Sequence, residues 1–221
     1  MGGPCLSDGK TVKPGTDNFE LKPFIMHGVQ YWSSEHAYQA LKMSNSADRT
    51  KIVKLVPRKG EKAWDHGMRV WQKGQQGKAR SDWEAVKIEA MYFANKCKIE
   101  QNPDCLEALL ATTGPFTHSG SGAFWDYWNP VLLEVIREEL RSDGNAARVA
   151  SLWAEMEAYR KKKGCERSFL EDAVAAPEEP ADADDGSAVS KSPEALLQAF
   201  QNWDANGDGT IDRQELMAAM V

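Results

Sequence analysis

The sequence predicts an α+β protein with a mostly helical body, a small N-terminal β-hairpin, an acidic linker and a C-terminal helix–loop–helix unit. Three observations predict this organisation. Apolar residues recur every three or four positions in several segments, which is typical of helices that pack on a core. Two short runs with β-forming residues flank His27-Gly28, a turn signal. After about residue 166 the composition becomes acidic and large apolar side chains become rare, which is typical of a linker.

The expected domains follow from these shifts in composition. We expect a disordered start at 1–16, a folded domain at 17–165, a flexible linker at 166–191 and a separate unit at 192–221. Residues 166–221 hold 13 acidic and 3 basic residues, so the first 165 residues carry a net charge of +4 although the whole chain has −6. A mildly basic body could accept an anionic ligand such as a phosphate, but +4 is too little for general nucleic-acid binding.

Other sequence features bear on location. No apolar run approaches the ~20 residues of a membrane-spanning helix. The four cysteines form no Cys-x-x-Cys pair, which favours a reduced, intracellular protein, most simply a cytoplasmic one.

Turn residues and apolar spacing place the elements in order. Strands are expected at 24–26 and 29–32, and Ser33 or Ser34 is a suitable N-cap for a helix that runs to about residue 44. The aromatic segment 116–130 is expected to be a loop. Further helices are expected at 47–55, 59–71, 79–99, 106–110, 131–140 and 146–163.

The C-terminal unit contains the segment 204–215, DANGDGTIDRQE. Oxygen-bearing residues alternate along it, Gly209 permits a sharp turn, and a glutamate stands at the twelfth position, which is the pattern of an EF-hand calcium loop. The pattern predicts Ca²⁺ as cofactor, and no organic cofactor is predicted. The expected ligands are Asp204, Asn206, Asp208, Thr210 through its carbonyl, Asp212 and Glu215. Because EF-hands usually pair, we expect this one to pair with a second copy or with a partner's EF-hand.

The segment SSEHAYQALK at 33–42 concentrates polar groups on one helix. Glu35, Gln39 and Lys42 lie at i, i+4 and i+7 and therefore share one face. By spacing alone, such a face is more often solvated than catalytic.

A longer pattern changes this interpretation. The motifs Gly28-x-x-Tyr31-Trp32-x-Ser34-Glu35-His36-x-x-Gln39-x-x-Lys42 and Arg80-x-Asp82-Trp83-x-x-x-Lys87 resemble the signature of the NADAR superfamily, also called YbiA-like. The resemblance covers about residues 17–140. It implies an N-glycosidase-type hydrolase that acts on a small phosphorylated, nucleoside-like ligand. The bond cleaved would be an N-glycosidic bond, either in ribosylamino-pyrimidine phosphates of riboflavin synthesis or in ADP-ribose attached to a base.

The resemblance also implies the roles of individual residues. Glu35 and Lys42 would be the catalytic pair. The residues implied to bind substrate are Asn18, Trp32, Gln39, Trp83, Trp125 and Asp126. The three tryptophans are equally compatible with core packing.

One departure from the family leaves a second interpretation open. The family usually carries acids in the segment that here is 117–125, and this segment has none, although Asp126 follows it. The alternative is a domain that has lost catalysis and binds a nucleotide-sugar or a protein in response to calcium.

Overall fold

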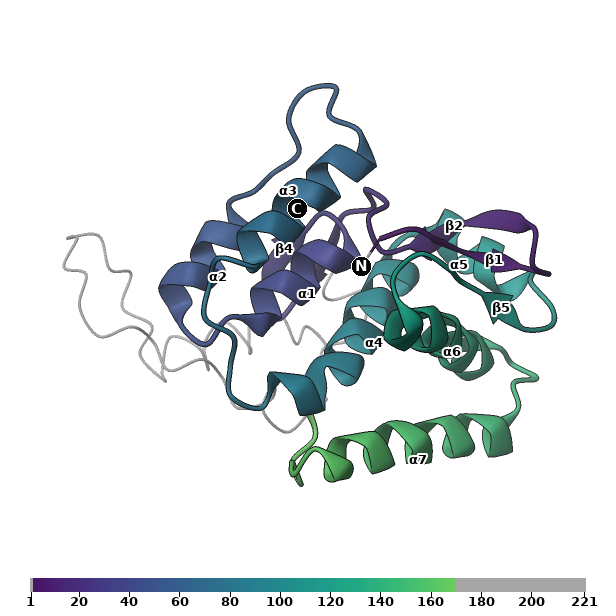
Figure 1. Cartoon of the computed structure of the whole chain (residues 1–221). Coiled ribbons are helices and arrows are strands. Elements are labelled where there is room, and N and C mark those ends of the chain that lie inside the picture. The colour runs from purple at the N-terminus through teal and green to yellow at the C-terminus, as the bar shows by residue number, and fades with distance from the viewer. Residues whose placement is uncertain (1, 170–221) are drawn as a thin grey trace, which may run out of the picture. The chain divides into compact units, whose positions relative to one another are not determined.

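A computed structural model describes residues 2–169 of the chain (Figure 1). The expected EF-hand ligands, the EF-hand unit and most of the expected linker lie outside the described residues. The elements are β1 (Pro4–Ser7), β2 (Thr11–Asp17), β3 (Phe24–Met26), β4 (Val29–Tyr31), α1 (Ser34–Lys42), α2 (Ser46–Val53), α3 (Ala63–Gly74), α4 (Trp83–Gln101), α5 (Pro103–Leu110), β5 (Phe116–Thr117), α6 (Ala123–Leu140) and α7 (Ala146–Lys162).

The small hairpin is confirmed. β3 and β4 pair antiparallel, with Met26 opposite Val29. The two turn residues have positive φ angles, 52° at His27 and 72° at Gly28. Two left-handed residues match the twist of a tight hairpin, and glycine adopts this conformation without steric cost.

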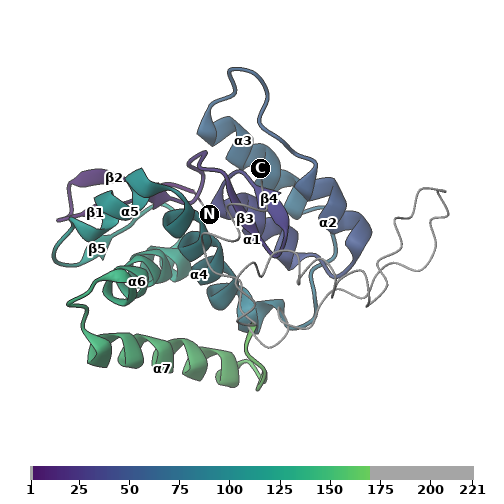
Figure 2. The ribbon, with the colours of Figure 1, turned by 180° about the vertical axis from the view of Figure 1, so that it is seen from behind.

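Helix α4 lies at the centre of the described residues. Figures 1 and 2 show it between the group α1–α3 and the group α5–α7. Two clusters of buried side chains correspond to these groups. One joins the hairpin to α1, α2 and α3, and the other joins α4 to α5, α6 and α7. Because α4 contributes to both clusters, it ties α1 to the second half of the domain.

The expectation of a disordered N-terminus is wrong for residues 2–16. β1 pairs antiparallel with both β2 and β5, so that Leu6 lies opposite Val12 on one side and Thr117 on the other. Cys5 points into the core. Half of this pairing depends on a strand more than 100 residues away, and local sequence periodicity carries no signal for such a partner.

The expectation of a loop at 116–130 is also wrong. Helix α6 begins at Ala123, two turns before the predicted start, and continues through Pro130. Proline inside a helix removes one backbone hydrogen bond. Here the burial of Trp125 and Trp128 in the core offsets that loss. Strand β5 accounts for the start of the same segment.

Glu89 of α4 holds both α7, through a buried ion pair with Arg160, and the segment that follows α7. Arg160 Nε donates to Glu89 Oε1 over 2.8 Å, and the other carboxylate oxygen of Glu89 accepts the backbone N–H of Phe169 over 2.6 Å. The Phe169 ring stacks on Phe93, with ring centroids 6.0 Å apart. The described body therefore packs as far as Phe169.

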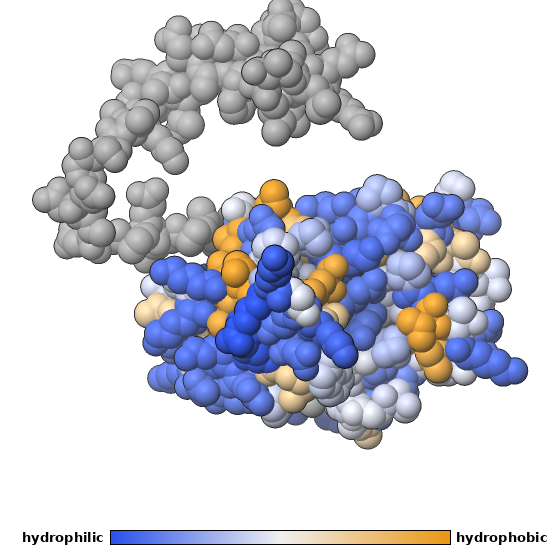
Figure 3. Space-filling view, turned by 90° about the horizontal axis from the view of Figure 1, so that it is seen from above, coloured by the Kyte–Doolittle hydropathy of each residue, from blue (hydrophilic) through white to orange (hydrophobic). Residues whose placement is uncertain are grey.

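The surface seen from above in Figure 3 is mainly hydrophilic, and its hydrophobic residues form separate small patches. Within residues 2–169, none of the helices combines the length and the apolar character that a membrane crossing requires.

Candidate active site

Helix α1 carries the candidate catalytic residues and is a buried helix. The hydroxyl of Ser33 accepts the backbone N–H of His36 over 3.2 Å and so caps the helix N-terminus. Glu35 is 0% exposed and Gln39 is 2% exposed. The solvated face that spacing alone favours is therefore not what the structure shows, because α2, α3 and α4 all pack around α1.

Glu35 and Gln39 form one hydrogen-bonded unit. Gln39 Nε2 donates to Glu35 Oε1 over 2.7 Å, one helical turn apart. The backbone N–H of Glu35 donates to the Asn18 carbonyl over 2.9 Å, which ties the helix start to the segment after β2. The orientation of the Gln39 amide directs its carbonyl toward Gly74 of α3, where an added Cβ would overlap Gln39 Oε1. α3 can approach α1 this closely because residue 74 has no side chain.

Lys42 lies in the last turn of α1. Its Nζ donates to the carbonyl of Gly74 over 3.3 Å. Burial lowers the pKa of Lys42 below its usual value of 10.5, and the negative charges of Glu35 and Glu84 oppose this shift without cancelling it. A lower pKa increases the fraction of neutral amine, which is the nucleophilic form.

Glu84 is a carboxylate that the sequence analysis did not assign to the site. It lies in the first turn of α4 and forms an ion pair with Lys87 over 2.6 Å. Its charge acts on both Lys42 and Tyr38. The signal in the sequence is its position directly after Asp82-Trp83, within the motif that resembles the family.

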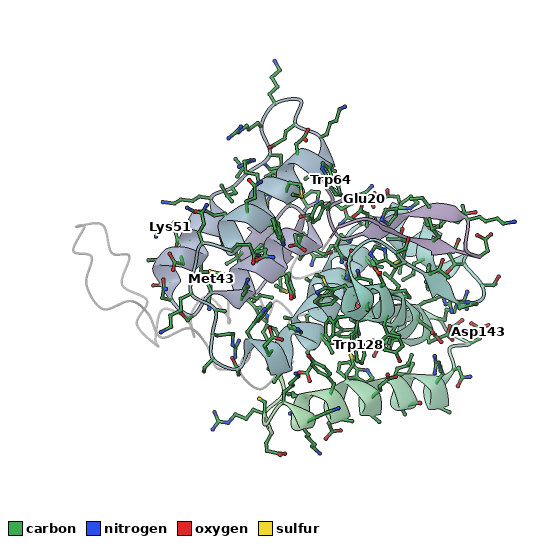
Figure 4. The ribbon with its side chains drawn as sticks, in the orientation of Figure 1. Glu20, Met43, Lys51, Trp64, Trp128 and Asp143 are labelled. Atoms are coloured by element: carbon green, nitrogen blue, oxygen red, sulfur yellow. The ribbon has the colours of Figure 1, made fainter. Side chains whose placement is uncertain are left out.

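Two of the three predicted tryptophans lie together beside α1. Tyr38 contacts Trp83 with ring centroids 4.7 Å apart and Trp125 edge-on at 5.5 Å. Both tryptophans are buried. Trp32 is only partly buried and, in residues 2–169, has no ring contact with this group; its backbone N–H donates to His36 Nδ1. Trp128, also on α6, lies toward α7 in Figure 4 and contacts Tyr159 at 6.0 Å.

The amide of Asn129 is a further polar group that the sequence analysis did not assign. Asn18 Nδ2 donates to Asn129 Oδ1 over 3.1 Å, between the segment after β2 and α6. Asn129 is 4% exposed, and its Nδ2 has no hydrogen-bond partner among the residues that the structure describes. With a loop expected at 116–130, nothing in the sequence pattern placed Asn129 near Trp125. The observed helix places Asn129 one turn after Trp125, on the same face.

Asp126 is positioned differently from the other predicted residues. Its Oδ1 accepts the backbone N–H of Ser121 over 2.8 Å and lies 3.8 Å from His118 Nε2. These contacts of Asp126 join the first turn of α6 to the preceding loop. The part of the chain that the structure describes contains no cluster of His, Cys, Asp and Glu that could hold a metal ion.

Comparison with family models identifies the body. The model described as the NADAR domain matches residues 6–125, more than half of the chain. The chain belongs to the NADAR family. A second model, an EF-hand domain, matches residues 195–221, so the chain combines the NADAR domain with an EF-hand, a calcium-binding motif. Both assignments confirm what the sequence motifs predict.

Two curated relatives and one solved structure are similar to this NADAR chain. It is 39% identical over 91 residues to the chloroplastic riboflavin biosynthesis protein PYRR of Zea mays, which is 41% of this chain and 14% of that protein. It is 28% identical over 160 residues to a riboflavin biosynthesis protein of Vibrio vulnificus, which is 64% of this chain and 42% of that protein. The chain therefore spans less than half the length of either relative. The NMR structure of YbiA from E. coli is 27% identical and covers 56% of this chain and 75% of that one, with a TM-score of 0.46.

Proposed function

We propose that the NADAR domain of this chain is an N-glycosidase-type hydrolase. Its substrate would be a ribosylamino-pyrimidine phosphate or an ADP-ribosyl or related nucleotide-sugar compound. One observation carries the proposal: a partly buried lysine with a lowered pKa lies on the same helix face as a buried glutamate–glutamine pair. The names of the two relatives, both riboflavin biosynthesis proteins, support a ribosylated pyrimidine as one substrate.

The chemistry of these groups fits cleavage of a sugar–nitrogen bond. The neutral Lys42 amine attacks C1 of the ribose while the C1–N bond breaks, and the electron pair of that bond leaves with the base nitrogen, which takes up a proton. The sugar ring then opens to an imine on Lys42, and water hydrolyses the imine to release the sugar. The Glu35 carboxylate stabilises positive charge at C1 and activates the water.

Trapping of the imine tests this proposal. The protein is incubated with each substrate class and borohydride, and peptide mass spectrometry locates the reduced sugar adduct. We expect the adduct on Lys42, and Lys42→Met should abolish both the adduct and base release. Lys51→Met is the matched control, because Lys51 is an exposed lysine that pairs with Asp48 on α2. An adduct that persists in Lys42→Met, or base release unaffected by this change, contradicts the assignment.

A second candidate function is supported by the departure from the family pattern. Segment 117–125 has no carboxylate, and Asp126 is hydrogen-bonded to the backbone of Ser121. A domain without the missing acids could retain ligand binding without the reaction, and would then bind a nucleotide-sugar or a protein. Tight binding of ADP-ribose without base release or imine trapping would favour this function.

For the EF-hand we propose the ligand set that the loop sequence predicts, from Asp204 to Glu215. We also propose that the unit pairs with another EF-hand, from a second copy or from a partner. The support is the position of each oxygen-bearing residue in the loop and the match of the EF-hand model over 195–221.

A further inference from the structure

The side chain of Asn129 is buried, and its amide N–H₂ group is unpaired in the part of the chain that the structure describes. Its carbonyl oxygen accepts from Asn18 Nδ2 over 3.1 Å. Nδ2 carries two hydrogens and has no acceptor within residues 2–169. A buried N–H₂ group without an acceptor destabilises the fold, so most buried amides in proteins are paired. An apolar residue would fill this position on α6 without that cost.

Three observations connect Asn129 to the candidate site. It lies four residues after Trp125 and therefore on the same face of α6. Trp125 contacts Tyr38 of α1. Asn18, the hydrogen-bond partner of Asn129, accepts the backbone N–H of Glu35 through its own carbonyl. Asn129 is thus connected to Glu35 through a single residue, Asn18.

We propose that Asn129 Nδ2 binds a hydroxyl oxygen of the substrate ribose. This inference rests on the proposed function, because it takes the ribosyl group to lie beside Glu35. A hydroxyl accepts from Nδ2 and can donate its own hydrogen to a carboxylate, whereas a phosphate only accepts and is repelled by Glu35. Asn129 is then a binding residue, and its unused donor is satisfied in the complex.

Two substitutions separate binding from folding. Asn129→Leu removes the unpaired donor and fills the site with apolar volume. Asn129→Asp keeps an oxygen for Asn18 and removes the donor. Asn95→Leu is the matched control, because Asn95 is also a buried asparagine, and its Oδ1 accepts from Ser34 Oγ over 2.7 Å.

The probe is ADP-ribose. Two analogues lack either the 2-hydroxyl or the 3-hydroxyl of the terminal ribose, the one whose C1 would carry the base. Binding to the full chain is measured by calorimetry, and unfolding by urea titration. We expect both Asn129 variants to raise the Kd of ADP-ribose about tenfold, the loss typical of one hydrogen bond. The effect should vanish for the analogue that lacks the contacted hydroxyl. Asn129→Leu should leave the urea midpoint unchanged or raise it, whereas Asn95→Leu should lower it.

The outcomes distinguish this inference from the proposed reaction. Unchanged ADP-ribose affinity in both Asn129 variants overturns the inference. A urea midpoint of Asn129→Leu that is lowered as much as that of Asn95→Leu also overturns it. So does a loss of affinity in the Asn129 variants that is equally large for both deoxy analogues. Absence of ADP-ribose binding by the unmodified chain also overturns it. Binding that depends on Asn129 in a chain that releases no base supports the inference and contradicts only the hydrolase.

Discussion

Gly74 sets the distance between α3 and the Glu35–Gln39 unit. Its backbone is helical, so alanine meets no conformational strain, but the new methyl group would overlap the amide of Gln39. We expect Gly74→Ala to lower the free energy of unfolding by about 2 kcal/mol, the usual cost of overpacking. We also expect it to reduce imine trapping on Lys42, whose Nζ donates to the Gly74 carbonyl. Urea unfolding and the trapping assay measure the two effects.

The control for Gly74→Ala is a double-mutant cycle with Gln39→Ala. Removing the Gln39 amide makes room for the methyl group, so the two substitutions should cost less stability together than the sum of their separate effects. Additive losses would show that the strain at Gly74 arises elsewhere. Trapping should remain low in the double variant, because Gln39 no longer orients the Glu35 carboxylate.

His36 makes the stability of the fold depend on pH. Its Nε2 is bonded to the Ile52 carbonyl over 2.8 Å and its Nδ1 accepts the Trp32 N–H, an arrangement that suits the neutral ring. Burial lowers the pKa of His36 to about 4. The unfolded chain, with a histidine pKa near 6.5, binds the proton more readily, so stability is complete above about pH 6.5 and falls as the pH drops toward 4.

At pH 5, we expect the free energy of unfolding to be about 2 kcal/mol lower than at pH 7.5 through His36 alone. Urea titrations at both pH values, compared between the chain and His36→Gln, measure this contribution. His66, whose pKa is also lowered by burial, adds to the loss in both proteins and so cancels in the comparison. An equal pH dependence in His36→Gln would contradict the prediction.

At the residue scale, the sequence predicts which side chains share a face better than it predicts their surroundings. The spacing of Glu35, Gln39 and Lys42 places them on one side of α1, as the structure shows. Their burial was not predictable from that spacing, because polar residues at helical intervals normally indicate a solvated face. Asn129 joins the site only through tertiary contacts, which local patterns do not encode.

At the scale of elements, substitutions at two N-caps of the same type can separate an effect on stability from an effect on activity. Ser33 caps α1, and Asn145 caps the exposed start of α7 by accepting the N–H of Arg148 over 2.9 Å. We expect Ser33→Ala and Asn145→Ala each to lower the free energy of unfolding by about 1 kcal/mol. Only Ser33→Ala should reduce imine trapping, because α1 alone carries Glu35, Gln39 and Lys42. Equal trapping in the two variants would show that the start of α1 does not position these residues.

The elements that sequence predicts well are those whose ends have chemical signals. Ser33 correctly predicted the start of α1, and the His27-Gly28 turn correctly predicted the hairpin. β1 lacks such signals, and its pairing with β5 comes from a distant partner. Pro130 gave a misleading signal, because proline normally precedes or begins a helix. Core packing of Trp125 and Trp128 keeps α6 helical on both sides of it.

At the scale of the whole chain, a NADAR domain and an EF-hand, a calcium-binding motif, are combined in one polypeptide. The described body packs as far as Phe169, whose backbone N–H donates to Glu89, and the EF-hand match begins at residue 195. The residues between these two points are rich in Asp, Glu, Ala and Pro and contain few large apolar side chains. Calcium binding can therefore be tested in the full chain by substitutions in the loop at 204–215, which change no residue of the NADAR domain.

Glu215 is the residue on which calcium affinity should depend most. At the twelfth loop position a glutamate supplies two oxygens to Ca²⁺, and glutamine offers one weaker, neutral oxygen. We expect Glu215→Gln to weaken Ca²⁺ binding more than about tenfold, measured by calorimetry on the full chain. Glu194→Gln is the matched control, because it removes the same charge ten residues before the loop in the sequence, at a position outside the predicted ligand set. Equal effects of the two changes would show that net charge, rather than coordination by Glu215, controls the affinity, and would contradict the proposed ligand set.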